Sequence, residues 1–385
     1  MSASIVFGGS GYVGTLIVAA VLAEAPRPLV LPIRATADRE ACMARIRTAL
    51  LARGIAHDAL EQRLGLISLI ELPAPDRLDE LAPMLRTLGA DELIHSAGCL
   101  DYWDTRLLHS VNVDLTRAIV ALARTAGISR ILYISTAYCS GYTDELIREQ
   151  LHSPPAPHDE PTEYTRTKRI AEAVVAASGV PFVIIRPSII IGDSQSGHYA
   201  GKNYGLYQWW RAIEGLLTRE YNPIWYTVAT HARLNLLHHD AFQAAILAIR
   251  ATDLRASIIH VVSDDANCPT TRELCWLWAD VYRPAEIHCY PSVDSVPLMA
   301  IPKRQRRVLE LAAKNLEIST RRWRFETRAL DLLRRAGLGF ADATLASVAR
   351  CQTRYIEQST RIQTYLHSLR PSSAGEPRLF DIAGY

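Results

Sequence analysis

Two side chains with complementary chemistry stand four residues apart in this chain, Tyr164 and Lys168. On a helix, residues at i and i+4 share one face, so the phenol and the ammonium would lie side by side. A neighbouring cation makes it easier to ionise a phenol, which lets a tyrosine exchange a proton near neutral pH. We therefore expect Tyr164 to be a proton donor and Lys168 to lower its pKa.

A glycine-rich turn near the N-terminus, residues 8–14, follows the apolar run 5–7. Glycines at this place let backbone N–H groups and the start of a helix approach a pyrophosphate. Because the turn lies between a predicted strand and an alanine-rich helix, it predicts a dinucleotide site rather than a tight turn alone. The expected cofactor contacts in the turn are Gly8, Ser10, Gly11, Tyr12, Val13 and Gly14. A hydride donor beside a proton donor predicts a reductase.

The second predicted strand, residues 29–33, is followed by Arg34, and the first acid after it is Asp38. An acid at the end of this strand would bind the ribose hydroxyls of NAD, whereas a guanidinium can pair with the 2′-phosphate of NADP. We therefore expect NADPH rather than NADH. The alternative for Arg34 is a solvated surface arginine.

Small and hydroxyl side chains follow two later predicted strands, where ligands bind in an open parallel sheet. Ser96, Ala97 and Gly98 follow one strand and would let the cofactor pass close to the sheet. Thr136 follows the other and is expected to donate a hydrogen bond to a developing oxyanion. Combined with Tyr164 and Lys168, Thr136 is interpreted as catalytic.

Several histidines could suggest other chemistry. His95 is interpreted as a packed or hydrogen-bonded histidine near the cofactor rather than as a catalyst. His238, His239 and Asp240 are consecutive, so the two histidines should point apart, and no spaced third ligand is evident. We assign no metal.

Apolar runs alternate with amphipathic segments in the first half of the chain, which predicts βαβ units and a parallel sheet. Strands are expected at 5–7, 29–33, 66–72, 92–96, 130–135, 182–186 and 258–262. Helices are expected at 15–25, 38–53, 112–125, 164–177, 239–250 and 271–282. The predicted fold is α/β, a Rossmann-like doubly wound parallel sheet with a smaller, mostly helical C-terminal substrate-binding subdomain.

The expected boundaries give residues 1–193 with about 228–265 to the NADP-binding domain, and 194–227 with 266–367 to a substrate-binding or lid subdomain. Residues 368–385 are expected to be a flexible tail. The stretch 194–235 is dense in tyrosine and tryptophan, which suits either the core of an accessory layer or a wall for an apolar or aromatic substrate. Both interpretations stay open.

Composition narrows the class of protein. A net charge of +2 over 385 residues makes nucleic acid an unexpected partner. No apolar stretch of about eighteen residues escapes charge or proline, so no membrane span is predicted, and no signal peptide is evident. Seven cysteines without a C-x-x-C pair suggest reduced thiols in a cytoplasmic protein. A monomer or homodimer is expected.

Taken together, these residues resemble the extended short-chain dehydrogenase/reductase superfamily over about residues 1–265. Its T-G-x-x-G-x-x-G turn matches residues 8–14, with Phe7 where threonine is usual. Its Ser/Thr–Tyr–Lys triad corresponds to Thr136, Tyr164 and Lys168. The R-P-x-x-x-x-G signature corresponds to residues 186–192.

Within that superfamily the chain resembles the thioester reductase and fatty acyl-CoA reductase branch, the male-sterility type. Residues 33–35 resemble its L-V-R-A segment, residues 134–138 its V-S-T-A-Y strand end, and residues 187–194 its P-S-x-I-x-G-D-S passage. The resemblance implies that Arg34 and Arg45 bind the NADPH phosphate. It also implies that Pro187, Ser188 and Ile190, with Tyr164 and Lys168, contact the cofactor.

The resemblance has departures. The Gly-Asp-Leu passage after the third strand is absent around residues 69–75, and Leu115 replaces a glycine. Without a preceding adenylation or carrier domain, a thioester substrate is expected to arrive in trans. The basic run 303–307 suits either docking of an acidic carrier or a solvated helix face.

The expected reaction is NADPH-dependent reduction of a carrier-protein- or CoA-bound thioester to an aldehyde or alcohol. The alternative is a reductase or dehydrogenase of a free ketone or alcohol on a cyclic or aromatic small molecule. A sugar-nucleotide epimerase or dehydratase fits less well, because those enzymes usually hold NAD and Arg34 favours NADP. A non-catalytic dinucleotide sensor would have little reason to keep Tyr164, Lys168 and Thr136 together.

Overall fold

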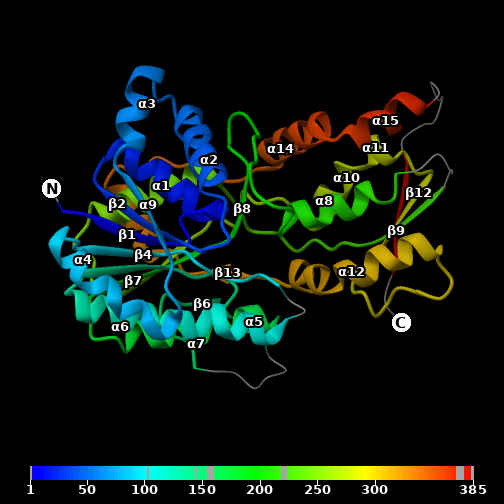
Figure 1. Cartoon of the computed structure of the whole chain (residues 1–385). Coiled ribbons are helices and arrows are strands. Elements are labelled where there is room, and N and C mark those ends of the chain that lie inside the picture. The colour runs from blue at the N-terminus through cyan, green and yellow to red at the C-terminus, as the bar shows by residue number, and fades with distance from the viewer. Residues whose placement is uncertain are drawn as a thin grey trace.

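A computed structural model describes residues 2–101, 104–143, 145–153, 160–217, 223–369 and 377–382. Within these residues the centre of the molecule is a seven-stranded parallel sheet in the order β11-β7-β5-β4-β1-β2-β3 (Figure 1). The strands are β1 (Ser4–Phe7), β2 (Leu29–Ile33), β3 (Ile67–Glu71), β4 (Glu92–His95), β5 (Arg130–Ile134), β7 (Phe182–Pro187) and β11 (Ser257–Val261). The strand order reverses between β1 and β4, so ligands are expected outside the carboxyl ends of these two strands.

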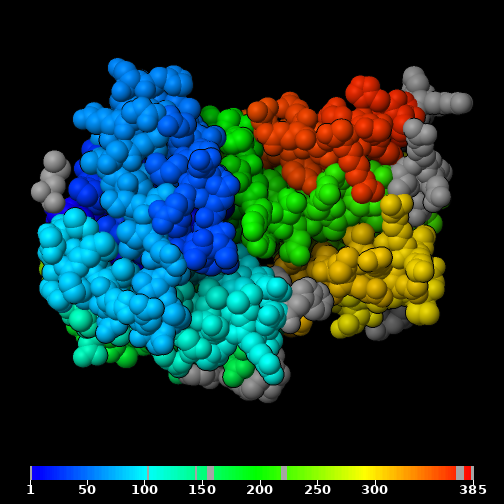
Figure 2. Space-filling model, in the orientation of Figure 1, coloured from blue at the N-terminus to red at the C-terminus, as the bar shows by residue number. Residues whose placement is uncertain are grey.

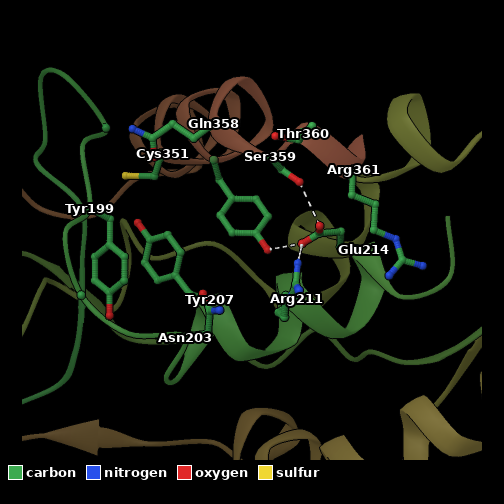
Figure 3. Close-up of a pocket in the computed structure, with 13 residues that line it drawn as sticks. Tyr199, Asn203, Tyr207, Arg211, Glu214, Cys351, Gln358, Ser359, Thr360 and Arg361 are labelled. Carbon is green, nitrogen blue, oxygen red and sulfur yellow. Dashed lines mark hydrogen bonds and ion pairs between the residues drawn. The ribbon is translucent and has the colours of Figure 1, made fainter. Parts of the chain in front are cut away.

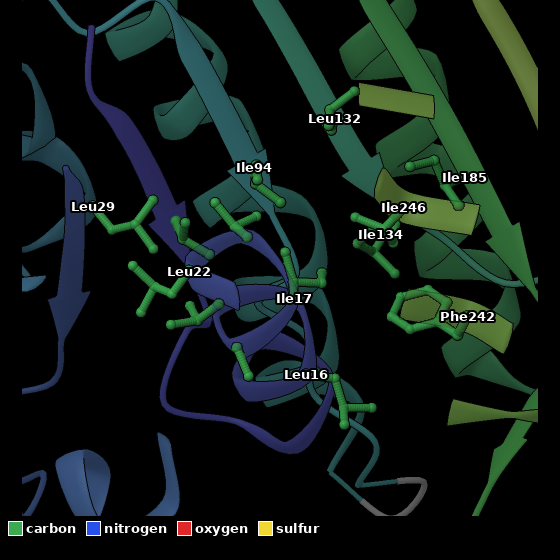
Figure 4. Packing of buried hydrophobic residues seen from close by; sticks show 14 of the residues in the cluster. Leu16, Ile17, Leu22, Leu29, Ile94, Leu132, Ile134, Ile185, Phe242 and Ile246 are labelled. Atoms are coloured by element: carbon green, nitrogen blue, oxygen red, sulfur yellow. The ribbon is translucent and has the colours of Figure 1, made fainter. Parts of the chain in front are cut away.

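Helices cover both faces of this sheet. One face packs against α1 (Tyr12–Glu24), α2 (Arg39–Ala52) and α9 (His239–Arg250), and the other against α4 (Ala82–Thr87), α6 (Leu115–Ala126) and α7 (Glu163–Ala176) (Figure 1). Every residue of β1 and β2 is buried, as expected for strands covered on both sides. Figure 4 shows the first of these layers, in which Ile17 and Leu22 of α1 and Phe242 of α9 pack on Ile94 and Leu132 of the sheet.

Shorter segments connect these elements. They are α3 (His57–Leu64), the 3-10 helix η1 (Pro75–Leu81), α5 (Thr105–His109) and the π-helical turn η2 (Ser110–Asp114). Helix α13 (Arg328–Arg335) returns from the second part of the molecule and packs on α9 and β11. Two small parallel pairs, β8 (Ile189–Ile191) with β10 (Leu236–His238) and β6 (Leu146–Ile147) with β13 (Arg324–Phe325), connect the two parts.

The second part has its own core of aromatic and aliphatic side chains. It contains a three-stranded parallel sheet, formed by β9 (Ile224–Val228), β12 (Glu286–Tyr290) and β14 (Arg378–Asp381). Its helices are α8 (Leu206–Glu214), α10 (Thr271–Trp276), α11 (Ala279–Tyr282), α12 (Lys303–Thr320), α14 (Leu345–Gln358) and α15 (Thr360–Ser368). In the space-filling view this part, green to red, lies beside the blue and cyan N-terminal part (Figure 2).

The predicted fold class is confirmed, and the structure differs from the sequence expectations in three places. The expected helix 271–282 is two short helices, α10 and α11. The second part is mostly helical, as predicted, but it also contains the sheet of β9, β12 and β14, which the sequence did not predict. Residues Arg378–Asp381 of the expected flexible tail form an edge strand beside β12. The remaining tail residues 370–376 and 383–385, and Tyr221 of the aromatic-rich stretch, lie outside the described residues.

No helix among the described residues combines the length and apolar character needed to cross a membrane. All seven cysteines are free thiols, and Cys99 alone among them is not fully buried. The division into two domains stays a prediction.

Candidate functional site

The glycine turn between β1 and α1 has a backbone that only glycine can adopt at two positions. Gly8 has φ of 82°, in the left-handed region, and a Cβ atom there would collide with the backbone of Ala97. A Cβ atom on Gly14 would collide with the carbonyl of Gly8. The turn is closed by a hydrogen bond from Gly11 N to Gly8 O of 2.9 Å. The glycines at 8 and 14 therefore allow the backbone of the turn to pack directly against the backbone of Ala97 and against itself.

Helix α1 begins at this turn with its N-terminus free of side-chain caps. Its N-cap, Gly11, has no side chain, and no acidic residue lies in the first turn. The unpaired N–H groups and the helix dipole favour an anion at such an end. Ser96, after β4, donates from both its N and its Oγ to Phe7 O, each at 2.9 Å. The predicted cofactor residues at 8–14 and 96–98 are thus brought together at one edge of the sheet.

The predicted phosphate-binding arginines lie at the same edge. Arg34 follows β2 directly and is exposed. Arg45, on α2, donates from Nη2 to Ser10 O in the glycine turn at 3.2 Å. Asp38, the first acid after β2, caps α2 by accepting a hydrogen bond from Ala41 N at 2.9 Å. The Asp38 carboxylate therefore caps α2, while Arg34 follows β2 and Arg45 of α2 contacts the glycine turn.

Tyr12, predicted to contact the cofactor, directs its side chain toward the second part of the molecule. Its hydroxyl lies 3.1 Å from His239 Nδ1, and its ring meets the ring of Tyr199 edge-on at 4.8 Å between centroids. Tyr199 stacks on Tyr207 of α8 at 3.6 Å, and Tyr207 meets Trp210 at 4.9 Å. A row of four aromatic rings therefore joins the start of α1 to α8.

Helix α7 positions Tyr164 and Lys168 as the i, i+4 spacing predicts. Thr162 caps the helix in a capping box with Thr165, which fixes the first turn where Tyr164 lies. Lys168 is only 4% exposed, and its Nζ donates to Ile134 O, at the end of β5, at 2.6 Å. The same ammonium lies 4.2 Å from the centre of the Tyr133 ring.

Burial lowers the pKa of Lys168 from its ordinary value to about 8, although Glu172 and Cys139 oppose the shift. An ammonium with this pKa still carries its charge at neutral pH and loses it a short way above. A cation held in this way favours the ionised form of a neighbouring phenol. The expected electrostatic role of Lys168 is therefore physically available.

Thr136 lies two residues beyond β5 and is 8% exposed. Its Oγ1 accepts a hydrogen bond from Tyr138 N at 3.4 Å, while Ala137 N donates to Pro187 O at 2.9 Å. The predicted cofactor contacts after β7 are therefore next to the end of β5. Ser188 is buried, and Ile190 is half-buried in β8. The predicted site residues thus come from the segments after β1, β2, β4, β5 and β7 and from the helices α2 and α7.

Two buried polar contacts that hold α7 in place were not assigned from the sequence. Glu172, one turn after Lys168, accepts two hydrogen bonds from Arg186 of β7, at 2.9 and 2.6 Å. Asn112, in the π-helical turn η2, donates to Thr167 Oγ1 of α7 at 3.0 Å and accepts from Cys99 N at 2.8 Å. The spacing of Glu172 after Lys168 is a usable sequence signal, whereas a π-helical turn has none in the hydrophobic pattern.

The histidines behave differently from one another. His95 is packed, as predicted: it is 1% exposed, its Nε2 lies 2.9 Å from Thr116 Oγ1, and burial followed by the charge of Lys168 lowers its pKa to about 3. The structure places Asp193 beside His239 and Asp240, with one ligand atom of each within 4.8 Å of the others, and the absence of a metal stays a prediction. Asp240 is engaged by both N and Oγ of Ser194, at 2.9 and 2.6 Å.

The aromatic-rich stretch contributes to the core of the second part, and its expected role as a substrate wall stays a prediction. Trp210 and Trp225 are buried in the core of the second part. Trp209 lines an apolar cavity of about 60 Å³, formed with Ile189, Leu206, Leu274 and Leu316. Ile189, in this lining, lies between the predicted cofactor contacts Ser188 and Ile190 in the chain.

A larger cavity, of about 460 Å³, lies on the other side of α8. Tyr199, Tyr207 and Tyr355 line it, and Figure 3 shows Arg211 and Ser359 on either side of the Glu214 carboxylate. That carboxylate accepts from Tyr355 Oη at 2.8 Å and pairs with Arg211 at 2.7 Å. In this larger cavity Glu214, Tyr355 and Arg211 are therefore bonded to one another. Helix α8 separates the larger cavity from the apolar one.

The part of the chain that forms this site is similar in sequence to known proteins. A family model described as male sterility protein, an NAD-binding domain, matches residues 6–240. Sterol demethylase protein B of Methylococcus capsulatus is 26% identical over 194 residues, which are 49% of this chain and 52% of that protein. The chain therefore spans about half the length of this curated relative.

Solved structures share the fold over almost the whole chain. The terminal R domain from the myxalamid PKS-NRPS biosynthetic pathway has a TM-score of 0.71 at 16% identity, covering 93% of this chain and 91% of its own. A thiolation-reductase di-domain from an archaeal non-ribosomal peptide synthetase has a TM-score of 0.67 at 17% identity, covering 94% and 76%.

The family match covers more than half of the chain, including the glycine turn, Thr136, Tyr164 and Lys168. It supports a nicotinamide dinucleotide as the cofactor of the site described above. The chain belongs to the male sterility protein family.

Proposed function

We propose that this enzyme uses NADPH to reduce a thioester, presented by a carrier protein or coenzyme A, to an aldehyde. The observation that carries the proposal is the placement of Lys168, whose buried ammonium is fixed at the end of β5 one helical turn from Tyr164. Tyr164, with Lys168 beside it, would be the proton donor. It lies at the same edge of the sheet as the glycine turn and Thr136, an arrangement that suits reduction of a carbonyl.

Arg34 and Arg45 are the proposed ligands of the 2′-phosphate. Arg45 is already held against the glycine turn through Ser10 O, and Arg34 is exposed at the end of β2. A guanidinium pairs with phosphate through two parallel hydrogen bonds, which gives both affinity and geometric selectivity. The use of Asp38 as a helix cap supports the same preference, because it leaves no free acid at this position in the described loop.

In this mechanism NADPH, when bound, supplies the hydride that adds to the carbonyl carbon. Thr136 and Tyr164 hold the carbonyl oxygen, and the Tyr164 hydroxyl donates the proton to that oxygen as charge develops. Lys168 lowers the pKa of the phenol and holds the cofactor ribose. The resulting hemithioacetal breaks its carbon–sulfur bond, so that an aldehyde forms and the sulfur leaves as a thiol.

The apolar cavity that Ile189 lines supports a substrate with an apolar portion. Its walls are mostly Leu, Ile and Trp side chains, which would bury an acyl chain and exclude water from the reacting carbonyl. The similar di-domain structure joins a thiolation domain to a reductase, which supports delivery of the substrate by a carrier.

A second candidate is reduction of a free ketone, or oxidation of a free alcohol, on a cyclic or aromatic small molecule. The curated relative carries the name sterol demethylase protein B, and a rigid apolar ring system would also suit a cavity with these walls. The two candidates differ in one product, since a thioester releases one thiol for each aldehyde formed and a ketone releases none.

The deciding experiment follows NADPH absorbance and free thiol together, with acyl-CoA thioesters, an acylated carrier protein and cyclic ketones as substrates. Equal NADPH consumption and thiol release with a thioester supports the proposal. NADPH consumption on the ketone alone, without thiol, supports the second candidate. Tyr164→Phe is expected to reduce turnover by about 10² to 10⁴-fold with little change in NADPH affinity. Tyr204→Phe, at an exposed tyrosine, is the matched control and should be neutral.

The cofactor preference has its own test. Arg34→Ala and Arg45→Ala are each expected to weaken NADPH binding by about tenfold or more and to leave NADH binding nearly unchanged. Arg47→Ala is the control, because Arg47 lies on the same helix as Arg45 but pairs with Glu61. Equal losses for the two nucleotides would refute a role at the 2′-phosphate.

A further inference from the structure

The Lys168 ammonium is buried with few conventional partners, which raises the question of what keeps it charged. An ammonium has three hydrogen-bond donors, and a buried charge is costly unless it is compensated. The ammonium donates a hydrogen bond to Ile134 O at 2.6 Å. The nearest acid on its own helix, Glu172, is bonded to Arg186 and to the Cys139 thiol. A further source of negative potential is therefore required.

That source is the ring of Tyr133. Tyr133 is fully buried, and its ring centre lies 4.2 Å from the Lys168 nitrogen. The face of an aromatic ring carries negative potential, and its attraction for a cation is strongest where water is excluded. On β5, Ile131 and Tyr133 face the layer of α6 and α7, while Leu132 and Ile134 face the opposite layer. The aromatic residue thus stands at the position of β5 that meets the ammonium.

Of the other titratable groups around Lys168, Glu172 also favours the charged ammonium, whereas His95 and Cys139 carry no charge at neutral pH. His95, on β4, lies 5.2 Å from the Tyr133 ring and is neutral at working pH, because burial lowers its pKa to about 3. Burial raises the pKa of Cys139, in the loop after β5, to about 12, so its thiol is also neutral. Glu172 stays ionised, but its charge is shared with Arg186. Tyr164 is the group that Lys168 is proposed to serve.

We propose that Tyr133 is a positioning residue of the active site, whose ring holds the Lys168 ammonium against the end of β5 and keeps it charged. The inference rests on the proposed function for its catalytic meaning, because Lys168 acts there on Tyr164. Its physical content, the stabilisation of a buried cation by a ring, is independent of the substrate.

The experiment compares Tyr133→Phe, which keeps the ring, with Tyr133→Leu, which removes it. The chain has four lysines, Lys168, Lys202, Lys303 and Lys314, so the side-chain carbons of labelled lysine can be resolved and titrated by NMR. In the cofactor-free protein, Tyr133→Phe should leave the Lys168 titration near that of the parent. Tyr133→Leu should lower its midpoint by about one pH unit, a tenfold change in acidity.

The same shift should appear in the reaction. The alkaline limb of the kcat/KM profile for Tyr133→Leu should move to lower pH, and Tyr133→Phe should restore it. Ile131→Val, on the same face of β5, controls for loss of packing, because it should lower the melting temperature without moving the titration. A Lys168 midpoint that is unchanged in folded Tyr133→Leu, or shifted equally in Tyr133→Phe, would overturn the proposal. Because the NMR titration needs no substrate, failure of the proposed reaction leaves this test valid.

Discussion

Replacing Arg186 by methionine is expected to destabilise the protein strongly, because it leaves the Glu172 carboxylate buried without its partner. The side chains of Arg186 and Glu172 are 0% and 1% exposed, and two parallel hydrogen bonds of 2.9 and 2.6 Å join them. Burial alone would raise the pKa of Glu172, but the hydrogen bonds and charge of Arg186 hold it below its usual value. Without the guanidinium, burial would dominate and raise the pKa of Glu172.

The size of the effect follows from this geometry. Breaking a buried ion pair by removing one partner costs about 3–5 kcal/mol. Arg186 also donates to Gln150 O at 2.9 Å, a bond worth about 1 kcal/mol. In the double variant Arg186→Met with Glu172→Gln no buried charge remains, so most of the loss should be recovered. The unrecovered part should be about 1–2 kcal/mol, from the backbone hydrogen bonds that only arginine makes.

The dependence on pH distinguishes this mechanism from a general loss of packing. In the parent, the folded pKa of Glu172 is depressed, so its contribution to stability is present above the unfolded pKa and is lost as pH falls through the folded pKa. In Arg186→Met the pKa of Glu172 in the folded protein should be raised instead, because burial is no longer opposed by Arg186. The variant should therefore be least destabilised at acidic pH and lose stability as pH rises through the folded pKa.

Urea unfolding of the parent, the single variant and the double variant at acidic and neutral pH measures these free energies. The reasoning fails if Arg186→Met costs less than about 1 kcal/mol at neutral pH, or if the double variant is no more stable than the single one. Activity of the refolded variants adds a functional check, since Glu172 lies one turn beyond Lys168 on α7.

Three further predictions test other parts of the structure. Gly14→Ala should weaken NADPH binding by at least about tenfold in a fluorescence titration, because its Cβ would collide with Gly8 O, whereas Gly339→Ala, in open space, should be neutral. Thr136→Val should lower kcat by about 10² to 10³-fold in steady-state assays and leave the NADPH dissociation constant unchanged. The pKa of Glu92 is depressed, chiefly by Arg250 against the effect of burial, so Glu92→Gln should flatten the fall in melting temperature below about pH 5.

The sheet could be predicted from the sequence because its signals are local. Apolar runs that are buried on both faces define the strands, and the bounds of β2 and α9 agree with the sequence expectation residue by residue. The second sheet could not be predicted in the same way. Its strands β9 and β12 pair Ile224 with Glu286, so the pairing depends on contacts between distant segments that leave no periodic pattern.

The candidate site also contains some features that are local in sequence and others that form only when the chain folds. The glycine turn and the spacing of Tyr164 and Lys168 are local patterns with a direct chemical meaning, so the sequence predicts them. The placement of Tyr133 under Lys168 and the approach of Asp193 to His239 exist only in the folded chain. Their residue types are common in buried strands and loops, so sequence alone could not single them out.

The row of rings from Tyr12 to Trp210 also has an optical consequence. With centroid spacings of 4.8, 3.6 and 4.9 Å, excitation absorbed by Tyr12 or Tyr199 can pass to Tyr207 and on to the indole. The first tyrosine of the row stands at the start of α1, while the tryptophan is buried in the second part. Light energy absorbed beside the glycine turn can therefore reach the indole of Trp210 on α8, in the other part of the molecule.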